Sequence, residues 1–193
     1  EGVCGCLSSG GTESIVLGSG GGLTLVLLNE LGFTNVQGLD FIAPPIRFKN
    51  RVTRLLKPTV FQPCYHILKG DLLDTGLPGG EWDFITCISV LEHGVDPDKF
   101  LREASRLLAP GGRVLVTFDY WEDFRAEDHP DMKIFDLPWN IFNREQVARM
   151  IESAADHGLT PLDGSEIPPC RDRVVHYAER DYTFMAVALR KSA

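Results

Sequence analysis

Three glycines, Gly18, Gly20 and Gly22, stand at alternating positions directly after the short apolar stretch 15–17. A run with helical character, 23–31, follows them at once. Glycine has no Cβ and tolerates positive φ angles, so a turn of this kind lets the backbone approach a ligand closely. The free amides at the start of the following helix then face that ligand. This order of strand, glycine turn and helix predicts a cradle for a nucleotide-like molecule.

Two carboxylates follow later predicted strands, where such a ligand would lie. Asp40 ends the strand expected over 35–39, and Asp71 follows the one expected over 65–68. Ligands of α/β sheets bind at the carboxyl ends of the strands, and an acid after the second strand can accept both hydroxyls of a ribose. Asp71 suits the exocyclic amine of adenine, because an ionised carboxylate only accepts hydrogen bonds. Asp is also common in turns, so an ordinary turn role stays open for both residues.

The composition is typical of one globular domain and argues against several classes of function. The chain has 193 residues, of which 44% are hydrophobic and 24% charged. A formal net charge of −8 argues against nucleic-acid binding, which needs a basic surface. No apolar run approaches the roughly 20 residues of a membrane helix. An odd set of five cysteines and no visible signal peptide favour a reduced, cytoplasmic protein, and no metal site is expected.

Strand and helix patterns alternate along the rest of the chain. Asp96 is the expected N-cap of one helix, with Pro97 as its first residue. Asn143 and Gln146 have capping-box spacing at the start of another, expected over 144–157. Such alternation implies a mostly parallel sheet with helices on both faces. The other elements expected are a helix over 46–56 and strands over 83–90, 113–118 and 182–189.

The domain organisation expected from these patterns is simple. Residues 1–14 are rich in glycine and serine and are expected to be a flexible leader. Residues 15–193 are expected to form a single domain. A long irregular segment near 121–142 interrupts it, and such segments in compact domains are usually functional or disordered. We therefore expect a lid-like insertion there.

The sequence resembles class I S-adenosylmethionine-dependent methyltransferases of the small-molecule type. The long middle block is the most specific part, because few other families combine a buried strand, Leu-Glu-His, and a helix ending in Leu-Leu-x-Pro-Gly-Gly. The resemblance implies a Rossmann-like, doubly wound α/β fold with a seven-stranded sheet whose last strand is antiparallel. It covers nearly all of residues 13–191 and rests on IVLGSGGG (15–22), VQGLD (36–40), LKGDL (68–72), WDFITCISVLEHGVDPDKFLREASRLLAPGGRVLVTFDY (82–120) and YTFMAVALRK (182–191).

The resemblance also assigns roles toward S-adenosylmethionine, whose product is S-adenosylhomocysteine. The glycine turn would face the amino-acid part, Asp40 the ribose, and Phe41 the adenine. Further residues would border the adenine or line the sulfonium centre. The implied set is Gly18, Ser19, Gly20, Gly22, Asp40, Phe41, Asp71, Leu72, Ile88 and Ser89.

Two departures from the family pattern stand out. The family often has an acid two positions before the first glycine, where this chain has Val16. Related enzymes usually also carry a helix before the first strand, where this chain has only residues 1–14. The cofactor pocket is therefore expected to be partly open, with no local partner for the methionine amine.

The implied reaction moves a methyl group from a sulfonium to a hydroxyl or amine of a small molecule, for which a sugar or polysaccharide precursor is one candidate. The protein must align the reacting atoms and can remove a proton from the acceptor. His93 follows the fourth strand and is the best candidate base, because imidazole accepts a proton near neutral pH. Tyr120 follows the fifth and could form a wall for the acceptor. Ordinary packing is about as plausible for each.

Two other functions fit parts of the sequence. A nicotinamide-dependent oxidoreductase shares the glycine turn and the acid, but its usual G-x-G-x-x-G spacing is absent. A member that binds a cofactor or partner without catalysis would explain Val16. A small-molecule acceptor is the expected partner and a homodimer is possible, whereas the identity of the acceptor cannot be read from the sequence.

Overall fold

A single mixed sheet forms the centre of the protein. The computed structural model describes residues 12–20, 22–33, 35–42, 66–134 and 136–193. Its strand order is β3-β2-β1-β4-β5-β10-β8, with β9 paired to β10 as the eighth strand. The strands from β3 to β5 run parallel, whereas β10 is antiparallel to β5, β8 and β9. The strands are β1 (Glu13–Leu17), β2 (Asn35–Asp40), β3 (His66–Lys69), β4 (Trp82–Ile88), β5 (Leu108–Tyr120), β8 (Leu159–Pro161), β9 (Val175–Tyr177) and β10 (Arg180–Lys191).

This topology confirms the doubly wound, mostly parallel sheet with an antiparallel last strand. The path contains seven strands, the number that the resemblance implies; the sequence patterns located six of them and missed β8, and β9 adds a hairpin at the end of β10. The first strand begins at Glu13, two residues earlier than the pattern predicts. The rest of the predicted leader and the helix predicted over 46–56 lie outside the described residues, apart from Thr12.

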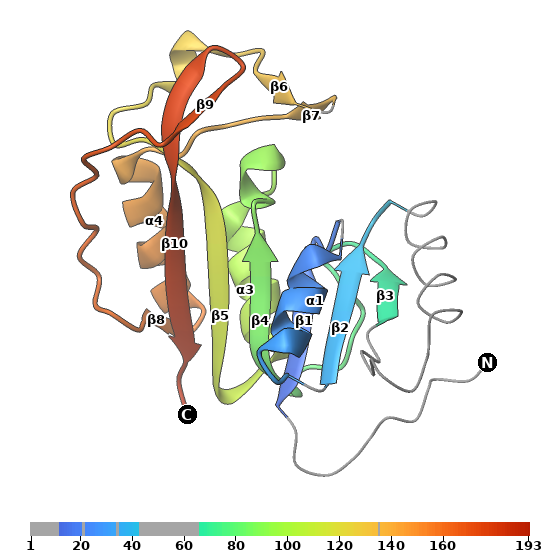
Figure 1. Ribbon diagram of the computed structural model, residues 1–193. Helices are drawn as coiled ribbons and strands as arrows, with labels where there is room; N and C mark the ends of the chain where they lie inside the picture. Colours follow the sequence, from blue (N-terminus) through green and yellow to red (C-terminus); the bar gives the residue numbers. More distant parts are fainter. Residues whose placement is uncertain (1–11, 21, 34, 43–65, 135) are drawn as a thin grey trace.

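Helices lie on both faces of the sheet (Figure 1). The helix α1 (Leu23–Glu30) lies in front, while α3 (Pro97–Leu107) and α4 (Arg144–Asp156) lie behind. The predicted caps are present: the Asp96 carboxylate accepts from the amides of Asp98 (3.1 Å) and Lys99 (3.3 Å). Asn143 and Gln146 form a complete capping box at α4. Local sequence signals therefore fix where these helices begin.

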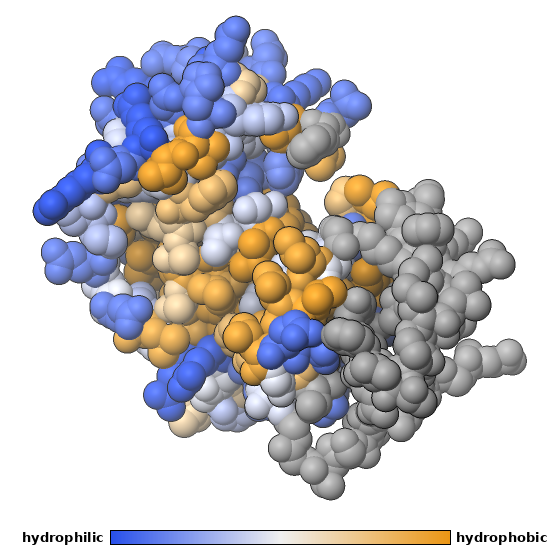
Figure 2. Space-filling view, viewed as in Figure 1, coloured by the Kyte–Doolittle hydropathy of each residue, from blue (hydrophilic) through white to orange (hydrophobic). Residues whose placement is uncertain are grey.

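The two faces of the sheet have separate apolar cores. The larger core packs β1, β4, β5 and β10 against α3 and α4. The smaller one lies under α1 and includes Val16, Leu25 and Val36. The outer side of α1 is also apolar, since Leu23 and Leu27 are exposed, and Figure 2 shows apolar side chains gathered over this helix. None of the helices in the described residues is long and apolar enough to cross a membrane.

A third apolar cluster forms a cap beyond the carboxyl ends of β4 and β5, at the top of Figure 1. We call residues 121–142 and 175–182 the cap. It contains η2 (Ala126–Asp128) and the small hairpin of β6 (Lys133–Ile134) with β7 (Leu137–Pro138). Trp139, Ile141 and Tyr182 are its buried centre. The insertion predicted near 121–142 is therefore packed against the β9–β10 hairpin.

The buried carboxylate of Glu103 links α3 to the loop between β3 and β4 by accepting hydrogen bonds from Thr75, and it predicts an acid-sensitive step in stability. Glu103 is 6% exposed and accepts from Thr75 N (2.9 Å), Thr75 Oγ1 (2.6 Å) and Arg106 Nε (2.8 Å). Burial raises the pKa of Glu103, but the hydrogen bonds and the charge of Arg106 outweigh this and lower it to about 2.

We expect the Glu103 contribution, about 3 kcal/mol, to be complete above pH 4.5 and lost as pH falls toward 2, since the unfolded carboxylate protonates first. Urea unfolding from pH 7 to pH 2.5 measures this, with Glu103→Gln as the comparison. An equal loss of stability in both proteins over that range would contradict the prediction.

Candidate functional site

The glycine turn wraps closely around the end of β2. Gly18 N and Ser19 N both donate to Leu39 O, at 2.9 and 3.0 Å, and Gly22 N donates to Ser19 O at 2.7 Å. Gly18, Gly20 and Gly22 have φ angles of 71°, 41° and 77°. Because these angles are left-handed, the turn has the conformation for which glycine is suited. The predicted turn therefore forms, and it lies at the carboxyl ends of β1 and β2.

Gly18 also needs to be glycine because of a neighbour on another strand. A Cβ at this position would lie 2.6 Å from Val90 Cγ2, in the turn after β4. The ends of β1 and β4 thus approach each other more closely than any side chain at position 18 permits.

We expect Gly18→Ala to lower the free energy of unfolding by about 2 kcal/mol, from the left-handed φ and the contact with Val90. Gly22→Ala is the matched control, because its φ is also positive but nothing lies within 4 Å of the added Cβ. It should lose only about 1 kcal/mol. Adding Val90→Ala should recover part of the loss at position 18 alone, as measured by thermal unfolding. An identical effect at both glycines would show that the close approach is unimportant.

Asp40 connects the glycine turn to the end of β2. Its side chain is 8% exposed, with Oδ2 accepting from Gly20 N (2.7 Å) and Oδ1 from Ile42 N (3.1 Å). A carboxylate has about four acceptor positions, so two remain for a ligand. Phe41 and Ile42, directly after it, are 58% and 46% exposed. Asp40 can therefore order the turn and bind a ligand hydroxyl at once, beside an uncovered apolar surface.

The cofactor-binding residues predicted after β3 lie along the same edge of the sheet. Gly70 N donates to Asp40 O at 3.0 Å, which places the end of β3 beside that of β2. Asp71 Oδ1 accepts from Leu73 N at 2.8 Å, as in an ordinary turn, and Leu72 is buried. Both the turn role and the ligand role of Asp71 therefore remain open.

Ser89, after Ile88 at the end of β4, has a left-handed φ of 52° although it is not glycine. Its amide lies within hydrogen-bonding distance of Thr117 O (3.0 Å) and Thr117 Oγ1 (3.1 Å) of β5. Backbone strain of this kind gathers at ligand sites. The strained residue lies between the glycine turn and a group of buried acids.

The first of these acids is Glu92, in the short helix η1 (Leu91–His93). Its side chain is 2% exposed, and Oε2 has no hydrogen-bond partner among the described residues. Burial, helped by the charge of Asp119, raises the pKa of Glu92 to about 8, against hydrogen bonds from its own backbone and from Ser89. Glu92 can therefore exchange a proton near neutral pH.

The second acid, Asp119, belongs to β5 and is 6% exposed. Its Oδ2 accepts from Trp139 Nε1 of the cap at 2.8 Å, and Asn140 N of the cap donates to Glu92 O at 2.8 Å. Burial raises the pKa of Asp119, while hydrogen bonds from Trp139 and Tyr182 and the charge of His93 oppose this. Burial and the charges of Asp119 and Glu92 raise the pKa of Tyr182 to about 12.

We call Glu92, His93, Asp119 and Tyr182 the acid cluster. His93, the predicted base, belongs to it, and its buried Nδ1 has no hydrogen-bond partner in the part of the chain that the structure describes. Sequence analysis gave the other three members no role. Glu92 follows the buried strand β4, and Asp119 lies near the carboxyl end of β5, just after the strand predicted over 113–118; these positions were the available signal. Tyr182 had none, because folding of the cap brings it to the cluster.

Tyr120 lies on the other side of the sheet from the acid cluster. Its side chain is completely buried and packs with Phe142 and Val147 in the core under α4. Its direct neighbour on β10 is Thr183. Contact between Tyr120 and the methyl acceptor stays a prediction. The residue lies in the core under α4 and not beside the acid cluster.

The sheet order, the glycine turn after β1 and the acid ending β2 define the Rossmann-like fold of class I methyltransferases. The chain belongs to the Methyltransferase domain family, which matches residues 15–116.

Curated relatives and solved structures agree with this family. A ubiquinone biosynthesis O-methyltransferase of Pseudomonas aeruginosa is 29% identical over 107 residues, 55% of this chain and 44% of the relative. The same enzyme of a Caulobacter species is 33% identical over 106 residues, 55% of this chain and 40% of the relative. The chain thus spans less than half the length of these relatives.

Among solved structures, a putative sarcosine dimethylglycine methyltransferase of Galdieria sulphuraria has a TM-score of 0.68 at 16% identity, covering 94% of this chain and 78% of its own. A geranyl diphosphate C-methyltransferase of Streptomyces coelicolor, solved with S-adenosylhomocysteine, has a TM-score of 0.68 at 18% identity, covering 93% and 71%. At these identities, the likeness shows the shared fold.

Proposed function

We propose that this protein transfers a methyl group from S-adenosylmethionine to a hydroxyl or amine of a small molecule. One observation carries the proposal: the glycine turn, fastened to Asp40, shares an edge of the sheet with the buried acid Glu92, whose Oε2 has no partner among the residues that the structure describes. The first feature suits a nucleoside, and the second suits an acceptor that must lose a proton.

S-adenosylmethionine as the cofactor is supported by the Methyltransferase domain family and by the local fit. Asp40 retains acceptor positions for ribose hydroxyls, and exposed Phe41 offers an apolar face to adenine. Gly22 leaves open space beside the turn, because nothing lies within 4 Å of a Cβ added there, whereas Gly18 and Gly38 allow the strand ends to pack closely against Val90 and Ser19. Val16 is 1% exposed and packs under α1, so it provides no polar group for the cofactor.

When bound, S-adenosylmethionine supplies a methyl group activated by its sulfonium. The acceptor oxygen or nitrogen would take the methyl carbon from the sulfur, which would leave as the thioether, and the acceptor would release a proton for residues of this chain to receive. We infer that Glu92 and its neighbour His93 receive this proton. Asp119, which accepts a hydrogen bond from Tyr182, lies close enough for its charge to act on both Glu92 and His93. Removing a proton by a positioned base typically contributes about 10²–10⁴-fold in rate.

The class of acceptor is the finer part of the proposal. The named relatives are O-methyltransferases of ubiquinone biosynthesis, which favours a hydroxyl. In the cap, Trp139 packs edge-on to Tyr177 and Tyr182, with ring centroids 6.2 and 5.7 Å apart. Tyr177 is 46% exposed, and its ring, held by the buried Trp139, suits either a phenol or a sugar ring. A sugar or polysaccharide precursor therefore stays one of two candidates, and the cytoplasmic location stays a prediction.

Titration calorimetry followed by an acceptor panel tests the proposal. We expect S-adenosylmethionine and S-adenosylhomocysteine to bind and NAD⁺ not to bind. A catechol, a methyl glycoside and a primary amine are then incubated with S-adenosylmethionine, and mass spectrometry detects the gain of one methylene. Binding of NAD⁺ alone would overturn the proposal in favour of an oxidoreductase, and cofactor binding without transfer to any acceptor would favour a non-catalytic role.

His93→Asn should lower the rate of methyl transfer by about tenfold or more, because it removes one of the two proton acceptors. His157→Asn is the matched control. His157 lies at the end of α4, where it pairs with Asp98 of α3, away from the acid cluster. Initial rates at saturating cofactor make the comparison. Equal rates in both variants would remove His93 from the mechanism.

A further inference from the structure

The outer edge of β10 is paired at its two ends and open between them. It pairs with β9 over Arg180–Tyr182 and with β8 over Leu189–Lys191. Within the described residues, no strand pairs with this edge from Thr183 to Val187. The chain between β8 and β9, residues 162–174, passes around the gap, and we call this segment the arch.

Two features keep the arch away from β10. Pro168 and Pro169 lack backbone donors, so they cannot form a ladder. The arch is also fastened at a distance from the strand: Arg144 Nη2 donates to Ile167 O at 2.6 Å, and Arg144 Nη1 donates to Glu122 Oε1 at 2.9 Å. Cys170 N donates to the same Glu122 oxygen at 3.1 Å. The gap is therefore held open by hydrogen bonds.

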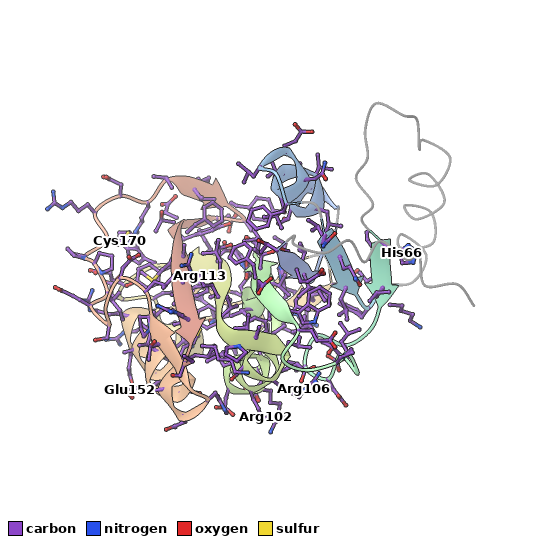
Figure 3. The ribbon with its side chains drawn as sticks, turned by 90° about the horizontal axis from the view of Figure 1, so that it is seen from below. His66, Arg102, Arg106, Arg113, Glu152 and Cys170 are labelled. Atoms are coloured by element: carbon purple, nitrogen blue, oxygen red, sulfur yellow. The ribbon has the colours of Figure 1, made fainter. Side chains whose placement is uncertain are left out.

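A pocket of about 370 Å³ fills this gap, between β10, α4 and the arch. It lies far from the glycine turn, since β10 is separated from β1 by β4 and β5. Figure 3 shows Cys170, on the arch, at the opposite side of the molecule from His66 of β3. Much of the wall of the pocket is apolar and is formed by Val147, Ile151, Ile167, Met185 and Val187. Its size and lining are those of a small-molecule site.

One polar side chain in the wall has an unpaired donor. Tyr120 lines the pocket and is completely buried, and its hydroxyl interacts with the guanidinium of Arg144, which can only donate. Among the described residues, none accepts the hydroxyl proton of Tyr120. A buried donor without an acceptor is unfavourable, and a ligand group that accepts from it would remove this penalty. This unpaired donor points to a ligand.

We propose that this pocket binds a small, ring-sized, mostly apolar molecule whose one polar group hydrogen-bonds to the Tyr120 hydroxyl. The ring would lie against Val147 and Ile151 of α4, under the arch. Neither of the residues proposed to receive the acceptor proton, Glu92 and His93, lines this pocket, so its test does not depend on the proposed function. Its ligand would nevertheless contact β5 one residue from Asp119 of the acid cluster.

Fluorine NMR with 4-fluorophenol and fluorobenzene tests the proposal on the full chain. We expect 4-fluorophenol to bind about five- to tenfold more tightly than fluorobenzene, the ratio typical of one hydrogen bond. Tyr120→Phe should abolish this preference, and Ile151→Trp should fill the pocket and prevent binding of both. Leu27→Trp, the same kind of enlargement on the exposed side of α1, should leave binding unchanged.

A second measurement uses the wild-type protein, so it does not depend on the folding of a variant. Cys170 is half-buried in the pocket wall, and bound 4-fluorophenol should slow its alkylation by iodoacetamide, followed by peptide mass spectrometry. Circular dichroism confirms that each variant is folded. No binding to the wild type at millimolar concentration, or equal binding to wild type and Ile151→Trp, would overturn the proposal. Unchanged preference in Tyr120→Phe would overturn the role of the hydroxyl.

Discussion

Glu92→Gln is expected to be more stable than the wild type above pH 7 and far less active. The two effects share one cause, the burial of a carboxyl group whose Oε2 has no partner among the described residues. Burial favours the neutral form, so ionisation of Glu92 opposes folding while it provides a proton acceptor. Glutamine keeps the size of the side chain and cannot ionise.

The stability effect follows from the raised pKa of Glu92, about 8 in the folded protein against an ordinary value of 4.5. The folded state holds a proton that the unfolded state has released, so the contribution of Glu92 is complete below pH 4.5 and is lost as pH rises to 8. Full ionisation costs roughly 3–5 kcal/mol. Urea unfolding should therefore show the gain of Glu92→Gln growing between pH 5 and pH 9.

The activity effect should follow ionisation of the same group. Wild-type methyl transfer should rise with pH up to about 8, and Glu92→Gln should be lower by about 10²–10⁴-fold at that pH. Glu103→Gln is the matched control, because it replaces another buried glutamate, far from the cluster and already paired with Arg106. It should lose stability and keep its activity.

Two results would contradict this account of Glu92. If Glu92→Gln retained the wild-type rate, another group would be the proton acceptor. If its stability fell in parallel with the wild type up to pH 9, Glu92 would not be the buried group that ionises. A rate loss combined with a stability gain is hard to produce by a folding defect.

The parts of the fold that were predicted have local signals. Asp96 with Pro97, and Asn143 with Gln146, fix the starts of α3 and α4 within a few residues of sequence. Alternating strands and helices then restrict the topology, because parallel strands need crossover helices. The glycine turn was predicted for the same reason, since apolar strand, glycines and helix are consecutive.

The parts that were not predicted depend on contacts distant in sequence. The strands β8 and β9 are three residues each and exist because β10 offers an edge for pairing. The acid cluster joins η1, β5 and β10, and Trp139 of the cap completes it. No local pattern indicates that Glu92 is buried or that Tyr182 reaches it. The sequence therefore predicts the cofactor-binding residues at the ends of β1, β2 and β3 better than it predicts the acid cluster.

Val16 and Asp40 show how structure changed one interpretation. Without an acid at position 16, the sequence offered no local partner for the methionine amine beside the glycine turn. In the structure, Val16 belongs to the apolar core under α1, and Asp40 accepts the Gly20 amide at 2.7 Å. The turn is thus ordered by the acid that was expected only to bind the ribose.

Asp40→Ala should therefore weaken S-adenosylmethionine binding for two reasons: the ribose loses its acceptor and the turn loses its bond to Gly20. We expect a loss of about 1–3 kcal/mol, or roughly 5- to 150-fold in Kd, measured by titration calorimetry. Asp40→Asn should lose less, because its amide oxygen still accepts one hydrogen bond.

Asp83→Ala is the matched control for Asp40→Ala. Asp83 also lies in a strand and accepts a backbone amide, from Glu13 at 2.9 Å, but near the amino ends of β1 and β4. Its loss should leave Kd unchanged. Since Asp40 acts through both the ribose and the turn, the two variants should also differ in amide hydrogen exchange at Gly20, with faster exchange only in Asp40→Ala. Equal Kd values for wild type and Asp40→Ala would remove Asp40 from the cofactor site, whatever its effect on the turn.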